Sequence, residues 1–126
     1  MDNLTGTVWR VTGARAVDAE GREHPSPLGP APMGIIEFGS ERMMGAIGDG
    51  RAPSGPGQAP RRYFSYTGSY RFDGDRLVVD SDAATSADLL SPQVRGVRFE
   101  GESRMVLIPP PREGNITVEI YWERLR

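Results

Sequence analysis

The stretch that most constrains the fold is residues 63–72, YFSYTGSYRF, which is followed by Asp73 and Gly74. Aromatic residues and one glycine occupy its even positions between 64 and 72, and mostly polar residues occupy the odd ones. A period of two is typical of a β-strand that buries one face. An Asp-Gly pair before a second apolar run predicts a hairpin, because glycine supplies the positive φ that tight turns need. The chain must therefore bury one face of an antiparallel sheet.

Strand signals recur along the whole chain, with turn residues between them. The predicted strands are residues 6–13 with a possible extension to Val17, 33–39, 42–48, 62–72, 76–82, 94–100, 104–109 and 116–125. Consecutive strands joined by short turns are antiparallel. Closing eight such strands into a barrel would remove their exposed edges.

We therefore expect an all-β fold, an eight-stranded antiparallel up-and-down barrel formed by one domain over residues 1–126. Sixteen glycines and eleven prolines favour strands and turns over helices. At most one short helix is expected, in residues 84–92, with Thr85 or Ser86 as its cap.

Two segments interrupt the strands. Residues 24–32, HPSPLGPAP, are too rich in proline for a central strand and should form an extended loop over the surface or a barrel mouth. Residues 48–60 form a long Gly/Pro-rich loop, and loops of this length are often functional. If the two loops meet at one mouth, we expect them to frame and gate an entrance.

Alternation also assigns the inward face, on which eight of the ten aromatic residues fall. Tyr63 and Tyr121 are expected to point outward. The inward positions of Tyr66 and Tyr70 favour an interior that holds a ligand, because an unpartnered hydroxyl in a dry core is costly. The alternative is that both hydroxyls reach backbone groups at the barrel end.

Composition narrows the function classes. The net charge of −2 lacks the basic footprint of a nucleic-acid-binding protein. There is no cysteine, all fifteen basic residues are arginine, and His24 is the only histidine, so thiolate, lysine Schiff-base and histidine-rich metal chemistry are excluded. No cofactor and no metal site are predicted. The arginine bias suggests a GC-rich bacterial genome.

The N-terminal residues do not resemble a signal peptide. No apolar run approaches the roughly 18 residues of a membrane helix. We therefore expect a cytoplasmic protein without a membrane partner.

Five stretches in order resemble the bacterial and fungal lipocalin-like domain proteins of the calycin group. They are LTGTVWRV at the start, PLGPAPMGIIEF (28–38), FSYTGSYRFDGDRLV (64–78), VRGVRFEG (95–101) and YWERLR at the end. Lipocalins carry a Gly-x-Trp near the N-terminus, whereas two residues separate Gly6 from Trp9 in this chain. The resemblance implies that Arg124 packs over Trp9 and that these residues, with Trp122, close the barrel as structural elements.

The resemblance also implies a barrel that binds a small hydrophobic molecule, and we expect a hydrophobic or aromatic metabolite as the ligand. The candidate ligand-binding residues are Ile36, Phe38, Met44, Phe64, Tyr66, Tyr70, Phe72, Phe99 and Ile120.

Two other functions stay open. The first is a cofactor-free cyclase or isomerase of natural-product biosynthesis, with Tyr66 and Tyr70 as candidate catalytic residues. The second is an interaction domain with a filled barrel, in which the outward Tyr63 and Tyr121 would mark a homodimer contact.

Overall fold

A computed structural model describes residues 3–50 and 62–126 of the chain. The described residues form nine strands and one short 3-10 helix, η1. The elements are β1 Val8–Val17, β2 Glu23–His24, β3 Pro32–Phe38, β4 Arg42–Asp49, β5 Tyr63–Phe72, β6 Arg76–Ala84, η1 Ala87–Leu90, β7 Gln93–Phe99, β8 Arg104–Ile108 and β9 Thr117–Arg124.

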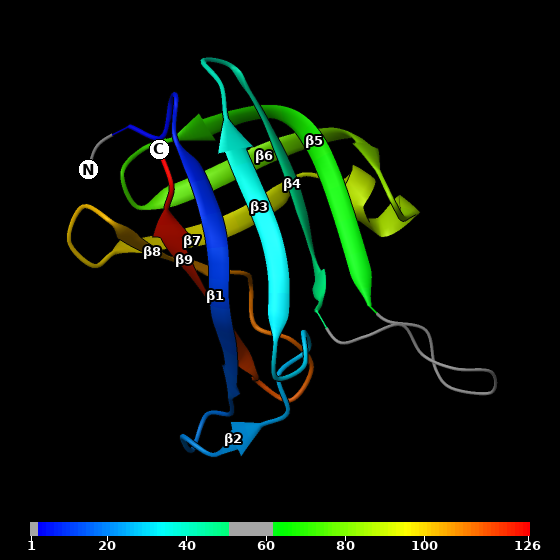
Figure 1. Ribbon diagram of the computed structural model, residues 1–126. Coiled ribbons are helices and arrows are strands. Elements are labelled where there is room, and N and C mark those ends of the chain that lie inside the picture. Colours follow the sequence, from blue (N-terminus) through cyan, green and yellow to red (C-terminus); the bar gives the residue numbers. More distant parts are fainter. Residues whose placement is uncertain (1–2, 51–61) are drawn as a thin grey trace.

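The strands form one sheet that closes on itself (Figure 1). Their order is β2-β1-β3-β4-β5-β6-β7-β8-β9, and β1 also pairs with β9. All pairings among the described strands are antiparallel, and β2 is a short arm that pairs with β1 alone among them. The predicted eight-stranded antiparallel barrel is therefore confirmed, and this architecture is compatible with a lipocalin-like fold.

The predicted helix is smaller than expected. Only one 3-10 turn forms, over Ala87–Leu90, and Ser86 takes the N-cap position without a side-chain hydrogen bond. The Thr85 hydroxyl instead accepts a hydrogen bond from the backbone N–H of Ser65, at 3.2 Å. Thr85 thus ties β5 to the segment that follows β6 rather than capping a helix.

A bulge in β1 changes which side chains point inward. The register with β9 shifts between Val11 and Gly13. Trp9 and Val11 are buried before the bulge, as predicted, and Ala16 is buried after it. Arg15 consequently lies outside the barrel, where it forms an ion pair with Glu23.

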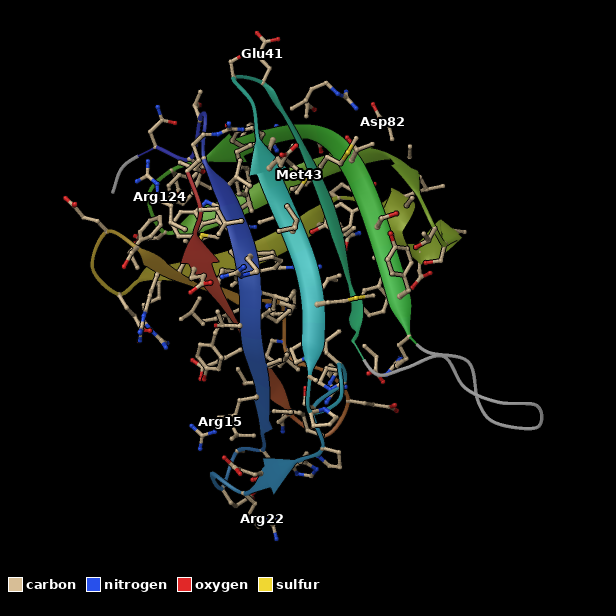
Figure 2. The ribbon with its side chains drawn as sticks, viewed as in Figure 1. Arg15, Arg22, Glu41, Met43, Asp82 and Arg124 are labelled. Atoms are coloured by element: carbon tan, nitrogen blue, oxygen red, sulfur yellow. The ribbon has the colours of Figure 1, made fainter. Side chains whose placement is uncertain are left out.

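The barrel has two different ends. The closed end carries both chain termini and the β3–β4, β5–β6 and β7–β8 turns, and Figure 2 shows Glu41 and Arg124 there. The open end carries the longer connections and β2, close to Arg15 and Arg22. Fully buried side chains fill the closed end, among them Leu4 and Trp9.

One glycine allows two strands to approach each other at a bulge. The register of β5 with β6 shifts between Thr67 and Gly68. A Cβ atom at Gly68 would lie 2.1 Å from the carbonyl oxygen of Asp80, so any larger residue would force the strands apart.

Candidate functional site

A cavity of about 310 Å³ opens at the open end of the barrel. Its walls combine inward side chains of the strands with residues from four connections. The lining residues are Pro27, Leu28, Ile36, Gly45, Ala46, Ile47, Arg62, Phe64, Tyr66, Ser86, Asp88, Leu89, Arg95, Leu107, Pro109, Arg112, Val118, Ile120 and Trp122.

Small residues leave this space unfilled. Across the sheet, Tyr66 pairs with Gly45 on one side and with Ala84 on the other, and Gly45 pairs in turn with Ile36. These small neighbours leave room beside the Tyr66 ring. At the closed end the corresponding pair on β3 and β4 is Phe38 and Met43, and both side chains are buried.

The proline-rich loop contributes directly to the wall. Leu28 is only 1% exposed, and it lines the cavity together with Pro27. The backbone N–H of Gly50 donates to the carbonyl of Ala31 at 2.8 Å, so the proline-rich loop meets the start of the β4–β5 connection at the same mouth. Residues 51–60 of the second predicted entrance loop lie outside the described residues.

The two inward tyrosines have different surroundings. The Tyr70 hydroxyl donates to the carbonyl of Gly39 at 2.6 Å and lies 3.1 Å from the Thr5 hydroxyl. For Tyr70 the alternative prediction is therefore confirmed, because its hydroxyl reaches a backbone group at the end of the barrel. The Tyr66 side chain lines the cavity, and its hydroxyl bonds to no residue in the described part of the chain.

The predicted ligand-binding residues divide into three groups. Those that line the cavity are Ile36, Phe64, Tyr66 and Ile120. Those that pack in the filled closed half are Phe38, Tyr70, Phe72 and Phe99. Edge-to-face ring contacts link these aromatics, with centroids 5.2 Å apart for Phe38 and Tyr70 and 6.0 Å apart for Phe72 and Phe99.

The third group is Met44 alone, and its predicted place in the interior is wrong. Its side chain is 60% exposed, whereas the neighbouring Met43 is 2% exposed and belongs to the core. Met44 pairs with Glu37 and Thr67 on the outer face. The inward positions of β4 are therefore odd-numbered.

Sequence reasoning missed Arg95, which lines the cavity from β7. It shares the inward parity of Val97 and Phe99, so strand alternation alone could have identified it. Its guanidinium donates to the carbonyl of Val94 at 2.8 Å and to the Gln93 side-chain oxygen at 3.3 Å. The Gln93 amide in turn donates to the carbonyl of Ser91 at 2.7 Å, which holds the pair in place.

The residues expected to close the barrel lie on β1 and β9. They are Trp9, Trp122 and Arg124. Trp9 and Arg124 are direct cross-strand partners, and the Trp9 indole donates to the Thr7 hydroxyl at 2.8 Å. The packing of the Arg124 guanidinium over the Trp9 ring stays a prediction. Trp122 is 4% exposed and also lines the cavity, and its indole nitrogen has no hydrogen-bond partner among the described residues.

Polar clusters occur outside the cavity as well. Hydrogen bonds with His24, and then with Arg22 and backbone N–H groups, hold the pKa of Asp18 well below its usual range. These residues stabilise the β1–β2 hairpin and do not line the cavity. Within residues 3–50 and 62–126 no cluster of three His, Cys, Asp or Glu side chains could hold a metal ion.

The two outward tyrosines also differ from each other. Tyr63 is 55% exposed. Tyr121 is half-buried, and its hydroxyl donates to Glu119 at 3.0 Å. Burial raises the pKa of Tyr121, and the hydrogen bond from Arg98 holds the pKa of Glu119 below its usual range.

Comparisons of the chain with family models, with curated proteins and with solved structures find no match. In the part of the chain that the structure covers, no helix is long and apolar enough to cross a membrane.

Proposed function

We propose that this protein is a lipocalin-like barrel that binds a small, largely apolar molecule in the cavity at its open end. The observation that carries the proposal is the cavity itself, of about 310 Å³ with apolar strand residues in its walls. That volume lies at the lower limit of the roughly 300–1,000 Å³ of small-molecule pockets. The ligand is therefore a compact molecule.

The contrast between the two ends supports a binding role over a filled barrel. The closed half is packed with side chains of very low exposure, such as Leu77 and Met105. In the open half, the small residues Gly45 and Ala84 flank the Tyr66 ring and leave space beside it. Barrels of this strand number are wide enough either to be filled by side chains or to hold one small ligand.

Membership of the lipocalin-like proteins is part of the same proposal. It is supported by the closed antiparallel strand order and by the pairing of Trp9 near the start of β1 with Arg124 at the end of β9.

The test is to fill the cavity and measure uptake of a neutral fluorescent dye, N-phenyl-1-naphthylamine. A Cβ atom at Gly45 would meet its nearest neighbours, Ile36 and Met43, at ordinary contact distances of 3.5 Å and 3.7 Å. Gly45→Leu should therefore fold and occupy the space beside Tyr66. Thr67→Leu, on the outer face of β5, adds a similar apolar group elsewhere.

We expect the wild type and Thr67→Leu to bind the dye saturably and Gly45→Leu to lose at least about tenfold in affinity, since an apolar group displaces the ligand from its site. Equal binding by Gly45→Leu and the wild type would contradict a site in the barrel. The fold of each variant is checked by its thermal unfolding.

The hydroxyl of Tyr66, which bonds to no residue that the structure describes, favours a second candidate function, a cofactor-free cyclase or isomerase. A hydroxyl in this cavity can donate to a substrate carbonyl oxygen as negative charge develops on it. The cavity would hold a flexible substrate in a reactive conformation. Tyr66→Phe separates the candidates, because a carrier loses only modest affinity and an enzyme loses rate well beyond its loss of binding.

A further inference from the structure

We infer that the ligand of this cavity is an organic acid, with an apolar body and one carboxylate or similar anionic group that Arg95 binds. The inference rests on the proposed function and adds the chemical class of the ligand. It is carried by the position of Arg95, by the partners that this side chain has and lacks among the described residues, and by the charges of the residues that line the cavity.

Arg95 is a charged side chain on the inner face of the barrel. It is half-buried, and its cross-strand partner Leu77 is fully buried. One N–H group on each terminal guanidinium nitrogen is used, by the Val94 carbonyl and by Gln93. The remaining N–H groups of the guanidinium bond to no residue in the described chain. The guanidinium is thus oriented but only partly satisfied.

Arg95 also lacks a carboxylate partner among the described residues. Six arginines form ion pairs with carboxylates of described residues, and all six lie outside the cavity. They are Arg10, Arg15, Arg22, Arg42, Arg71 and Arg98. A charge removed from water is costly unless it is paired. A carboxylate entering the barrel would supply the missing partner, and guanidinium binds carboxylates through two parallel hydrogen bonds.

The described residues that line the cavity carry an excess of positive charge. They include Arg62, Arg95 and Arg112, and one carboxylate, that of Asp88. This local excess contrasts with the net charge of −2 for the whole chain. Like charges lining a cleft concentrate ions of the opposite sign at its entrance. The arginines that line the cavity therefore favour an anionic ligand, in a protein that is itself weakly negative.

The other lining residues suit the apolar body of an organic acid. Ile36, Leu107 and Ile120 provide apolar walls, and the Tyr66 hydroxyl is a further hydrogen-bond donor. Such a site takes an aromatic or short aliphatic acid, whose apolar body is buried while its acidic group meets Arg95.

The experiment compares two probes of the same shape, 2-naphthoate and the uncharged 2-naphthamide, by isothermal titration calorimetry at pH 7. We expect the wild type to bind both compounds and to prefer the carboxylate by about tenfold to a hundredfold, the effect of hydrogen bonds to a charged group. In Arg95→Gln the affinity for 2-naphthoate should fall to that of 2-naphthamide, and the affinity for 2-naphthamide should not change.

Two further variants control the result. Arg76→Gln removes an exposed arginine at the closed end, and it should leave both affinities at their wild-type values. Arg95→Lys keeps the positive charge but not the planar guanidinium group, which can donate two parallel hydrogen bonds. It should retain part of the preference for the carboxylate. Thermal unfolding of each variant shows whether the fold is intact.

The outcomes separate the inference from the proposed function. Equal affinity of the wild type for the two probes, or an equal loss of both in Arg95→Gln, would overturn the inference and leave the binding role standing. If the wild type binds neither probe, the proposed function fails and this inference fails with it.

Discussion

The closed and open ends of this barrel use the same kind of strand for different purposes. At the closed end, inward positions carry large side chains such as Phe38 and Tyr70, and the hydroxyl of Tyr70 is bonded to the backbone. At the open end, inward positions include Gly45 and Arg95, an arginine that has no carboxylate partner in the described part of the chain. The closed end is densely packed, whereas the open end leaves space between its inward side chains.

The largest effect is expected when one phenylalanine at each end is replaced by alanine and the two variants are compared. Phe38→Ala should cost about 3–5 kcal/mol of unfolding free energy, because the ring is 3% exposed and its removal leaves an enclosed cavity. Phe64→Ala should cost about 1 kcal/mol, because this half-buried ring borders a cavity that is already open. Urea unfolding of the two variants measures both values, and equal losses would contradict the division into two ends.

A smaller effect is expected from removing one hydroxyl at each end. Tyr70→Phe should cost about 1 kcal/mol, because it removes a hydrogen bond to the Gly39 carbonyl. Tyr66→Phe should leave the unfolding free energy unchanged, because its hydroxyl has no partner among the described residues. Thermal or urea unfolding gives the comparison, which fails if Tyr66→Phe is the more damaging change.

The charge of Arg95 should contribute little or nothing to the free energy of unfolding. Arg95→Met replaces a guanidinium without a carboxylate partner in the described chain by an apolar side chain. We expect its unfolding free energy to stay within about 1 kcal/mol of the wild type or to rise, because a desolvated charge is removed. A large loss in urea unfolding would show that Arg95 is a structural residue rather than part of a binding site.

The last expected effect concerns the β1–β2 hairpin at the open end and depends on pH. The pKa of the Asp18 carboxyl is lowered on folding, mainly by its hydrogen bond with His24. A lowered pKa adds stability above the ordinary aspartate pKa of about 3.9, and this stability is lost as the pH falls through the lower folded value. Asp18→Asn should therefore lower the melting temperature at pH 7 and differ less from the wild type at pH 3.

The control for this measurement is Glu102→Gln, an exposed residue in the β7–β8 turn that makes no hydrogen bond to a described residue. It should shift the melting temperature little at either pH. If the difference in melting temperature between Asp18→Asn and the wild type grows as the pH falls, the assigned cause is contradicted.

Much of the fold follows from alternation in the sequence. Residues 62–72 are predicted as a strand and Tyr63–Phe72 form β5, because mostly aromatic residues alternate with polar ones from residue 64 to residue 72. The same rule places Ile36 and Ile120 inside, and both line the cavity. A two-residue strand such as β2 is too short to produce a pattern.

Alternation fails where the pattern is ambiguous or interrupted. In β4 the adjacent Met43 and Met44 put an apolar residue at both parities, and packing decides which one is inside. In β1 the bulge after Val11 reverses the parity and sends Arg15 outward. Arg95 was missed for another reason, because a charged residue at an inward position opposes the usual rule that such positions are apolar.

The cavity itself could not be derived from the sequence. Its existence depends on how Gly45 and Ala84 flank the Tyr66 ring across three strands, and a register of this kind is known only once the sheet is assembled.

The location of the chain ends has a practical consequence. The carbonyl of Arg126 accepts a hydrogen bond from the Val8 backbone, so the last residue is held beside the start of β1, on the far side of the barrel from the cavity mouth. A tag, fluorophore or carrier protein attached beyond Arg126 would therefore leave the entrance unobstructed. When the molecule is immobilised on a sensor chip through that end, the entrance faces the flowing sample.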